Sequence, residues 1–254
     1  MPEFLSTLDK KEILSGFAEF VKYLLLDDNF YKHFIHDFSK FIKEKINFKT
    51  FSAFPYEKLK EFFIKNPKYL LKALNIKYKF LKDDLFDKNR RQILNLGHTI
   101  GHGLELNLKL SHGISLYPAI ILELIIVDEL RFLNLNQISK IKKTKKIKKK
   151  KIKLKSSKII EKAYDIYKIF KLPFDIDSSF LIEKGFSLQS WLSENNFDYS
   201  NLLDKIIESM HQDKKNKDKF YSIPIFYGLK NIKIKKISFD EFDKIFIEKL
   251  KDNK

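Results

Sequence analysis

The stretch from Asp84 to Glu105 reads DLFDKNRRQILNLGHTIGHGLE and combines acidic, basic, amide and histidine side chains with three glycines. Seven of its polar residues recur at steps of three or four, the spacing that places side chains along one face of an α-helix. They are Asp84, Asp87, Arg91, Asn95, His98, His102 and Glu105. The sequence therefore predicts one helix over residues 84–108 with these side chains on a single face.

A polar face of this kind is either a solvated surface stripe or the wall of a pocket. Surface stripes consist mostly of Lys and Glu, whereas this face carries Asp, Arg, Asn and His, with Gly97, Gly101 and Gly103 beside them. Glycine lowers helix propensity, and the close approach of another helix or of a ligand is the expected compensation. We therefore favour the pocket wall over the solvated stripe.

Two histidines of this stretch are one helical turn apart. His98 and His102 enclose the pentapeptide HTIGH, and His112 follows after a short loop. Zinc metalloproteases also place two histidines at this spacing, but they require Glu directly after the first one, where Thr99 stands here. A metalloprotease is therefore disfavoured. Since the chain has no cysteine, any transition metal must be held by His, Asp or Glu.

Apolar residues at helical spacing predict further helices on both sides of this stretch. Asp9 followed by Glu12 fits a capping box for a first helix. The other expected helices cover residues 29–45, 56–74, 115–133, 159–170, 199–210 and 239–250. Ser238 is the expected cap of the last one, and alternating apolar residues within 221–237 predict a small β-hairpin before it. The expected fold is one mainly α domain over residues 1–254 with a short β-hairpin near the C-terminus.

Residues 139–158 form a lysine-rich tract that supplies most of the net charge of +17. Eleven lysines lie between Lys140 and Lys155, so the rest of the chain carries only +6. Clustered lysines attract the phosphates of nucleic acid and of anionic membranes. A nucleic-acid platform also needs aromatic and Arg residues, which this tract lacks. We therefore predict an exposed, solvated insertion, with nucleic acid as a disfavoured partner.

No export or membrane signal is recognisable in the sequence. The first residues lead directly into polar sequence rather than into the apolar core of a secretory signal. The most apolar stretch, Ile114–Val127, contains Glu123 and is shorter than the roughly 20 residues that span a bilayer. The expectation is a cytoplasmic protein without membrane contact.

Three motifs, taken together, resemble those of the 3-dehydroquinate synthases in the sugar phosphate cyclase superfamily. The first is Arg91-x-x-Leu-Asn95-x-Gly-His98-Thr-x-Gly-His102, followed by Glu105 and Ser111-His112-Gly113. The second is Gly16-Phe-Ala-Glu19-Phe-Val-Lys22, and the third is Asp213-Lys214-Lys215 ahead of the hairpin. The resemblance is to the C-terminal metal- and substrate-binding domain of the family, a multi-helix domain of the dehydroquinate synthase-like fold.

The resemblance implies a lyase of the shikimate pathway, which leads to chorismate and the aromatic amino acids. Members of the family convert 3-deoxy-D-arabino-heptulosonate 7-phosphate to 3-dehydroquinate and phosphate. They use a divalent metal, Zn²⁺ or Co²⁺, and NAD as a transient hydride acceptor. The partner molecule implied for this chain is therefore a sugar phosphate.

The resemblance also implies a role for individual residues. Carried over by position, the metal ligands are Glu19, His98 and His112. The catalytic residues are His102, Lys22, Arg91 and Asn95. The residues that bind or orient the substrate are Lys77, Asp87, Lys214 and Lys215. Three nitrogen and oxygen ligands leave coordination positions open for substrate hydroxyls, as a catalytic zinc ion requires.

These 254 residues contain no recognisable nucleotide-binding motif. The 7 glycines form no G-x-G-x-x-G, and the sequence shows no alternating βαβ pattern. Members of the family begin with an NAD-binding domain. The expectation is therefore a half-enzyme that lacks this domain, is inactive alone and needs it in trans as a separate domain or subunit. The alternatives are half of another sugar phosphate cyclase, or a non-catalytic remnant that serves as a metal-binding or interaction module. Whether the chain forms a homodimer is left open by the sequence.

Overall fold

A computed structural model describes residues 2–47, 49–82, 84–86, 89–142, 146–185, 187–194, 198–213, 218–226 and 232–251, without the side chains of residues 2, 132–157 and 251. Its elements are η1 (Pro2–Thr7), α1 (Lys10–Leu26), α2 (Asp28–Ile42), α3 (Tyr56–Lys65), α4 (Lys68–Leu81), η2 (Arg90–Asn95), α5 (His98–Leu108), α6 (His112–Lys142), α7 (Lys146–Phe170), α8 (Ile176–Lys184), α9 (Leu188–Glu194), α10 (Tyr199–Gln212), β1 (Phe220–Phe226), β2 (Ile232–Ser238) and α11 (Phe239–Lys251).

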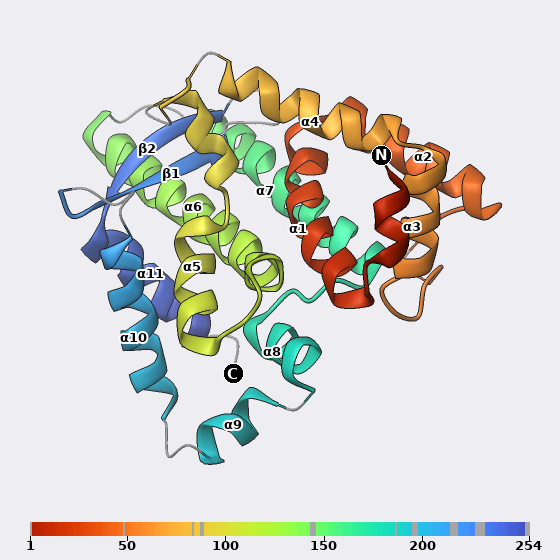
Figure 1. Cartoon of the computed structure of the whole chain (residues 1–254). Coiled ribbons are helices and arrows are strands. Elements are labelled where there is room, and N and C mark those ends of the chain that lie inside the picture. Colours follow the sequence, from red (N-terminus) through yellow and green to blue (C-terminus); the bar gives the residue numbers. More distant parts are fainter. Residues whose placement is uncertain are drawn as a thin grey trace.

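The predicted fold class is confirmed: the chain is mainly α with a two-stranded antiparallel hairpin near the C-terminus (Figure 1). Tyr221 of β1 lies opposite Ile237 of β2. Asp9 forms the predicted capping box with Glu12 at the start of α1, and Ser238 Oγ accepts a backbone hydrogen bond at the start of α11. Among the described helices, none has the length and apolar character needed to cross a membrane.

The prediction of one continuous helix over residues 84–108 was wrong. η2 is a 3-10 helix, and α5 begins only at His98. Gly97 stands between them with a φ of +81°, a left-handed conformation that glycine adopts without strain and that breaks the helix. A Cβ at this position would lie 2.7 Å from Ile120 Cγ1 of α6. The break therefore allows the turn at Gly97 to pack closely against α6.

Other boundaries also differ from the prediction. The helix expected over residues 56–74 is divided into α3 and α4 before Pro67, since proline disfavours the helical conformation in the residue before it. The helices α8 and α9 were not predicted. Both α6 and α7 continue into the lysine-rich tract. The predicted exposure of that tract concerns side chains that lie outside the described part of the structure.

Two clusters of buried side chains form the core, and α6 contributes to both. Tyr117 belongs to the cluster with α1 to α4 and α7, whereas Ala119 belongs to the cluster with α5, α10, the hairpin and α11. α5 lies close to α6 at Gly101 and close to α10 at Gly103, where an added Cβ would be 3.0 Å from Ile206 Cγ2. The close helix approach expected from these glycines is thus present.

Candidate metal centre

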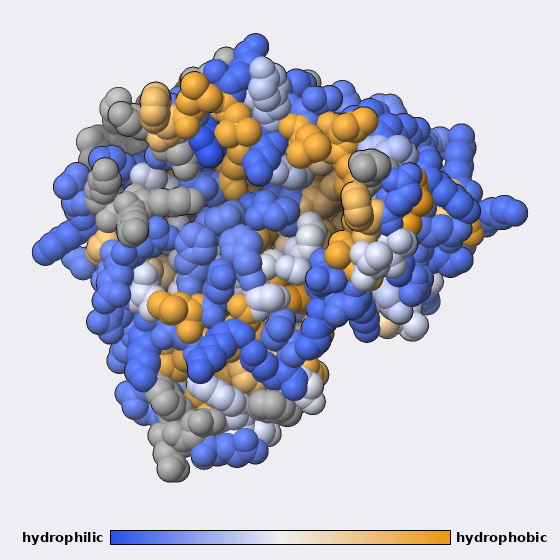
Figure 2. Space-filling view, viewed as in Figure 1, coloured by the Kyte–Doolittle hydropathy of each residue, from blue (hydrophilic) through white to orange (hydrophobic). Residues whose placement is uncertain are grey.

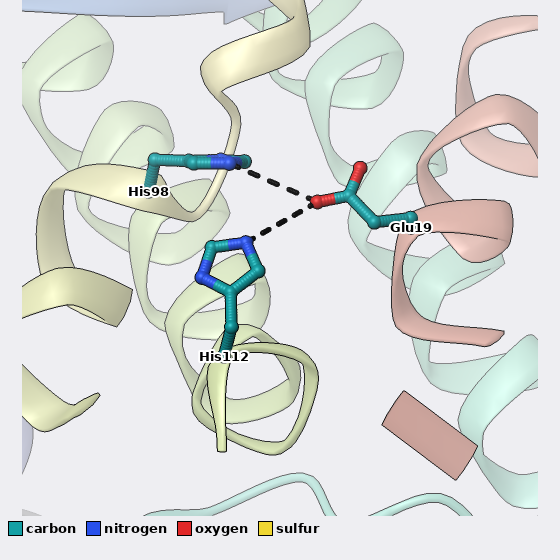
Figure 3. Close-up of side chains that lie close together, drawn as sticks. All are labelled: Glu19, His98 and His112. Carbon is teal, nitrogen blue, oxygen red and sulfur yellow. Dashed lines mark ion pairs between the residues drawn. The ribbon is translucent and has the colours of Figure 1, made fainter. Parts of the chain in front are cut away.

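A glutamate and two histidines from three helices converge on a common point. Glu19 lies on α1, His98 is the first residue of α5, and His112 is the first residue of α6. Glu19 Oε1 is 3.7 Å from His98 Nε2 and 3.6 Å from His112 Nε2. Figure 3 shows the carboxylate and both rings directed toward one another. The structure therefore brings together the three side chains that the sequence nominated as metal ligands.

Contacts between α1 and the start of α6 position two of these side chains. Gly113 donates its N–H to Ser15 Oγ at 3.2 Å, and any side chain at position 113 would collide with the backbone of Ser15. Four residues further along α6, the Tyr117 hydroxyl donates to the Leu14 carbonyl at 2.6 Å. Because Glu19 follows Ser15 by about one turn of α1, its carboxylate reaches the His112 ring.

The ammonium of Lys22 supports the cluster from the buried side. Lys22 is only 1% exposed. Its Nζ lies 2.8 Å from Glu19 Oε2 and 3.4 Å from His98 Nδ1, and it donates to the Leu94 carbonyl at 2.9 Å. A buried ammonium is tolerated only with such partners. In this structure, Lys22 contacts two of the nominated ligands and lies behind them.

Charge around the cluster keeps the Glu19 carboxyl ionised. Burial acts to raise its pKa, but the ion pair with His112 at 3.6 Å and the charge of Lys22 outweigh that effect and lower the pKa to about 2. The ion pair with Glu19 in turn raises the pKa of His112, with burial acting in the opposite direction and Glu105 adding to the rise. An ionised carboxylate beside two imidazoles is a donor set suited to a divalent cation.

Two further carboxylates contact histidines of the site. Glu105 Oε2 lies 2.9 Å from His112 Nδ1, and Asp213 Oδ2 lies 2.7 Å from His102 Nδ1. The sequence assigned no role to either carboxylate, although both stand in the motifs quoted above. Spacing could not reveal the second contact, because 111 residues separate its partners.

The remaining nominated residues occupy different surroundings. Asp84 lies outside any helix, and its Oδ2 accepts the backbone N–H groups of Asn89 and Arg91, so it shapes the loop before η2. Arg91 Nη1 donates to the Leu85 carbonyl at 2.7 Å. The predicted single face therefore does not exist upstream of Gly97.

The other substrate residues named from the sequence are only partly placed. Asn95 ends η2, immediately before the turn that leads to His98. Lys77 is exposed on α4. Asp87, Lys214 and Lys215 lie outside the described residues.

The geometry of the cluster fits a catalytic type of metal site. Zn²⁺ or Co²⁺ binds His nitrogen and carboxylate oxygen at roughly 2.0–2.2 Å, so ligand atoms of a tetrahedral site lie about 3.4 Å apart. The two separations from Glu19 Oε1, 3.7 Å and 3.6 Å, are close to this value. The side chains of Glu19 and His112 are 38% and 43% exposed. The face of the molecule drawn in Figure 2 has a hydrophilic area over α5. A small molecule can therefore reach the cluster.

The fold and the site define a helical domain that presents one glutamate and two histidines from three helices on an open face. A model of the family described as 3-dehydroquinate synthase C-terminal matches residues 16–172, which is more than half of the chain. The chain belongs to this family.

Curated relatives agree with this assignment over part of their length. The 3-dehydroquinate synthase of Staphylococcus carnosus is 34% identical over 128 residues, which cover 50% of this chain and 32% of that protein. The 3-dehydroquinate synthase of Pyrococcus abyssi is 33% identical over 122 residues, which cover 47% of this chain and 30% of that protein. The matched segment thus amounts to about a third of each relative.

A solved structure of a sugar phosphate cyclase shares the fold over nearly the whole chain. It is 2-deoxy-scyllo-inosose synthase complexed with carbaglucose-6-phosphate, NAD⁺ and Co²⁺. The TM-score is 0.55 at 16% sequence identity, and the match covers 97% of this chain and 54% of that chain. At this identity the likeness shows the fold alone, which is the dehydroquinate synthase-like fold.

Proposed function

We propose that this chain is the metal- and substrate-binding part of a 3-dehydroquinate synthase, which converts 3-deoxy-D-arabino-heptulosonate 7-phosphate to 3-dehydroquinate and phosphate. The observation that carries the proposal is the convergence of Glu19, His98 and His112 in a chain of this family. A divalent cation such as Zn²⁺ or Co²⁺, once bound, supplies a Lewis acid that lowers the pKa of a substrate hydroxyl.

The protein groups around that position have separable tasks. Glu19, His98 and His112 hold the cation, and the buried ammonium of Lys22 keeps the Glu19 carboxylate in place at 2.8 Å. His102 exchanges a proton with the substrate through Nε2, because its Nδ1 is occupied by Asp213. Lys22, His102 and His112 already contact carboxylates in the chain without substrate, which reduces the reorganisation needed for reaction.

Cationic and amide groups named by the family motifs orient the anionic substrate in the proposed enzyme. Arg91 and Asn95 lie on η2, directly before the turn that carries His98, and we assign them to its carboxylate and hydroxyls. Lys77, Lys214 and Lys215 carry the charge needed to attract its phosphate, and Asp87 orients one of the cations. These assignments rest on the family motifs.

NAD⁺ is held by a nucleotide-binding domain outside these 254 residues. Hydride removed from the substrate needs a nicotinamide as acceptor, and the sequence contains no glycine-rich loop for a pyrophosphate. In the proposed enzyme, that domain acts in trans and covers the open cluster. Covering the site excludes water and strengthens its electrostatic contacts with the substrate.

The test measures phosphate release from the heptulosonate phosphate in the presence of NAD⁺ and Co²⁺. We expect no turnover by the chain alone, and turnover once a separately expressed NAD-binding domain of this family is added. His98→Ala should then abolish turnover, whereas His36→Ala, which alters an exposed histidine on α2, should not. NAD-dependent turnover by the chain alone would contradict the need for a partner domain. Absence of turnover with the added domain would contradict the proposed activity.

A second candidate is the corresponding part of another sugar phosphate cyclase, because the similar solved structure is a 2-deoxy-scyllo-inosose synthase. The same assay distinguishes the two when glucose 6-phosphate replaces the heptulosonate phosphate. Turnover of glucose 6-phosphate alone would favour the second candidate. Metal binding without turnover of either substrate would favour a non-catalytic module.

A further inference from the structure

The His112 ring has a different carboxylate at each nitrogen. Nε2 faces Glu19 Oε1 at 3.6 Å, on the side where His98 also lies. Nδ1 lies 2.9 Å from Glu105 Oε2, which is within hydrogen-bonding distance. Glu105 is on α5, two turns after His98, so the same helix that carries one nominated ligand also reaches the back of another.

We propose that Glu105 is a positioning residue that holds His112 with Nε2 directed at the cation, an inference that rests on the proposed function. A neutral imidazole carries one ring proton, and the hydrogen bond made by one nitrogen decides which nitrogen is left for a metal. When Nδ1–H donates to Glu105, the lone pair belongs to Nε2. The negative charge of the carboxylate also makes that nitrogen a better electron donor.

The position of His112 explains why it needs such a support. His112 is the first residue of α6, and its side chain is 43% exposed. Few neighbouring atoms therefore limit rotation of the ring, whereas His98 is 15% exposed and lies against Lys22. Fixing the ring before the cation binds lowers the conformational entropy lost on binding.

A competing role for Glu105 is direct ligation of a cation. Atoms of His102, Glu105 and His112 also lie within 4.8 Å of one another. However, His102 Nδ1 already contacts Asp213, and His112 Nδ1 points at Glu105. Ligation of one cation by Nε2 and of a second by Nδ1 would require His112 to lose both ring protons. The geometry therefore favours one cation, with Glu105 behind its ligand.

The experiment measures Co²⁺ affinity of the metal-free full chain by isothermal titration calorimetry. We expect one Co²⁺ per chain, and we expect Glu105→Ala to weaken binding by roughly 10- to 100-fold. Glu105→Gln should have a smaller effect, because its amide oxygen still accepts from Nδ1–H. Glu183→Gln is the matched control. Glu183 Oε2 accepts a hydrogen bond from Ser111 Oγ, beside His112, but contacts neither the His98 ring nor the His112 ring. This control should bind Co²⁺ as the unsubstituted chain does.

A second measurement separates ring positioning from general loss of structure. Nitrogen-15 NMR of the Zn²⁺-loaded unsubstituted chain should show His112 protonated at Nδ1, and circular dichroism should show all variants equally helical. Unchanged affinity in folded Glu105→Ala, equal weakening in Glu183→Gln, or two Co²⁺ per chain would overturn the role of Glu105 and leave the proposed function intact. Absence of Co²⁺ binding by the unsubstituted chain would overturn both.

Discussion

At the scale of single residues, Glu123 is a carboxyl group enclosed in the core, 0% exposed on α6. Its Oε2 accepts the N–H of Gly97 at 2.9 Å, and Oε1 has no hydrogen-bond partner among the described residues. Burial raises its pKa from 4.5 to about 8, with the Gly97 hydrogen bond and the charge of Lys22 acting in the opposite direction. The group is therefore protonated in the folded chain at neutral pH.

This raised pKa predicts a pH dependence of stability. Between pH 4.5 and about 8, the unfolded chain releases the Glu123 proton while the folded chain retains it. The free energy of unfolding should therefore fall as pH rises through this window, by a few kcal/mol at about 1.4 kcal/mol per pKa unit. Glu123→Gln should remove that decline in urea titrations at pH 5 and pH 8. Glu129→Gln is the control, because it removes a solvent-exposed ion pair between the same helix and Lys249. This variant should keep the decline in stability.

Asp213 offers a second prediction at this scale. Asp213→Asn should lower kcat of the reconstituted enzyme by roughly tenfold or more, because the carboxylate fixes the tautomer and orientation of His102. Co²⁺ affinity should stay the same, since His102 is outside the proposed ligand set. The chain supplies a matched control in Asp243, which contacts His211 at 2.6 Å. If Asp243→Asn lowers turnover equally at a temperature where both variants are folded, the role of Asp213 is wrong.

At the scale of helices, Gly103 controls how closely α10 approaches α5. An added Cβ would lie 3.0 Å from both the side chain and the carbonyl oxygen of Ile206. Gly103→Ala should therefore destabilise the fold by about 1–3 kcal/mol, as overpacking does. Gly16→Ala is the contrasting substitution on α1, where nothing lies within 4 Å. It should stabilise the fold by up to about 1 kcal/mol through helix propensity. Thermal unfolding of both variants checks the pair, and equal effects would contradict the packing argument.

Helix positions were predictable where the signal was local. The Asp9 capping box and the proline after α7 mark boundaries that depend on a few neighbouring residues. The seven polar residues from Asp84 to Glu105 predicted a single helix wrongly, because helical spacing contains no information about the φ of Gly97. α8 has an Asp175 capping box and a left-handed Gly185 at its end, two local signals that mark a helix even where the apolar pattern is short.

The site was predictable as a set of residues rather than as a geometry. Family motifs nominated Glu19, His98 and His112, and the structure brings them together. The buried position of Lys22 and the Asp213 carboxylate behind His102 depend on packing between segments far apart in sequence. No periodicity within one segment encodes such contacts.

At the scale of the whole molecule, the lysine-rich tract lies between two parts of the core. Among the side chains that the structure describes, Leu130 is the last buried apolar one of α6 and Ile159 is the first of α7. Deleting residues 142–153 should therefore change the melting temperature little, because the nine lysines among them cannot be buried without a large desolvation cost. Differential scanning calorimetry checks this expectation. Loss of a cooperative transition in the deletion variant would show that the tract contributes to the fold.

The two core clusters have a further consequence for how the chain opens. Glu19 extends from a helix of the first cluster, and His98 from a helix of the second, with His112 at the start of the helix that serves both. A cation held by all three would link the local stabilities of the two halves, since it binds only when both are folded. Amide hydrogen exchange should show it: saturating Co²⁺ should slow exchange in α1 and in α5 by a similar factor. Without the ion, the two helices should exchange at independent rates, so opening of one half would leave the other protected.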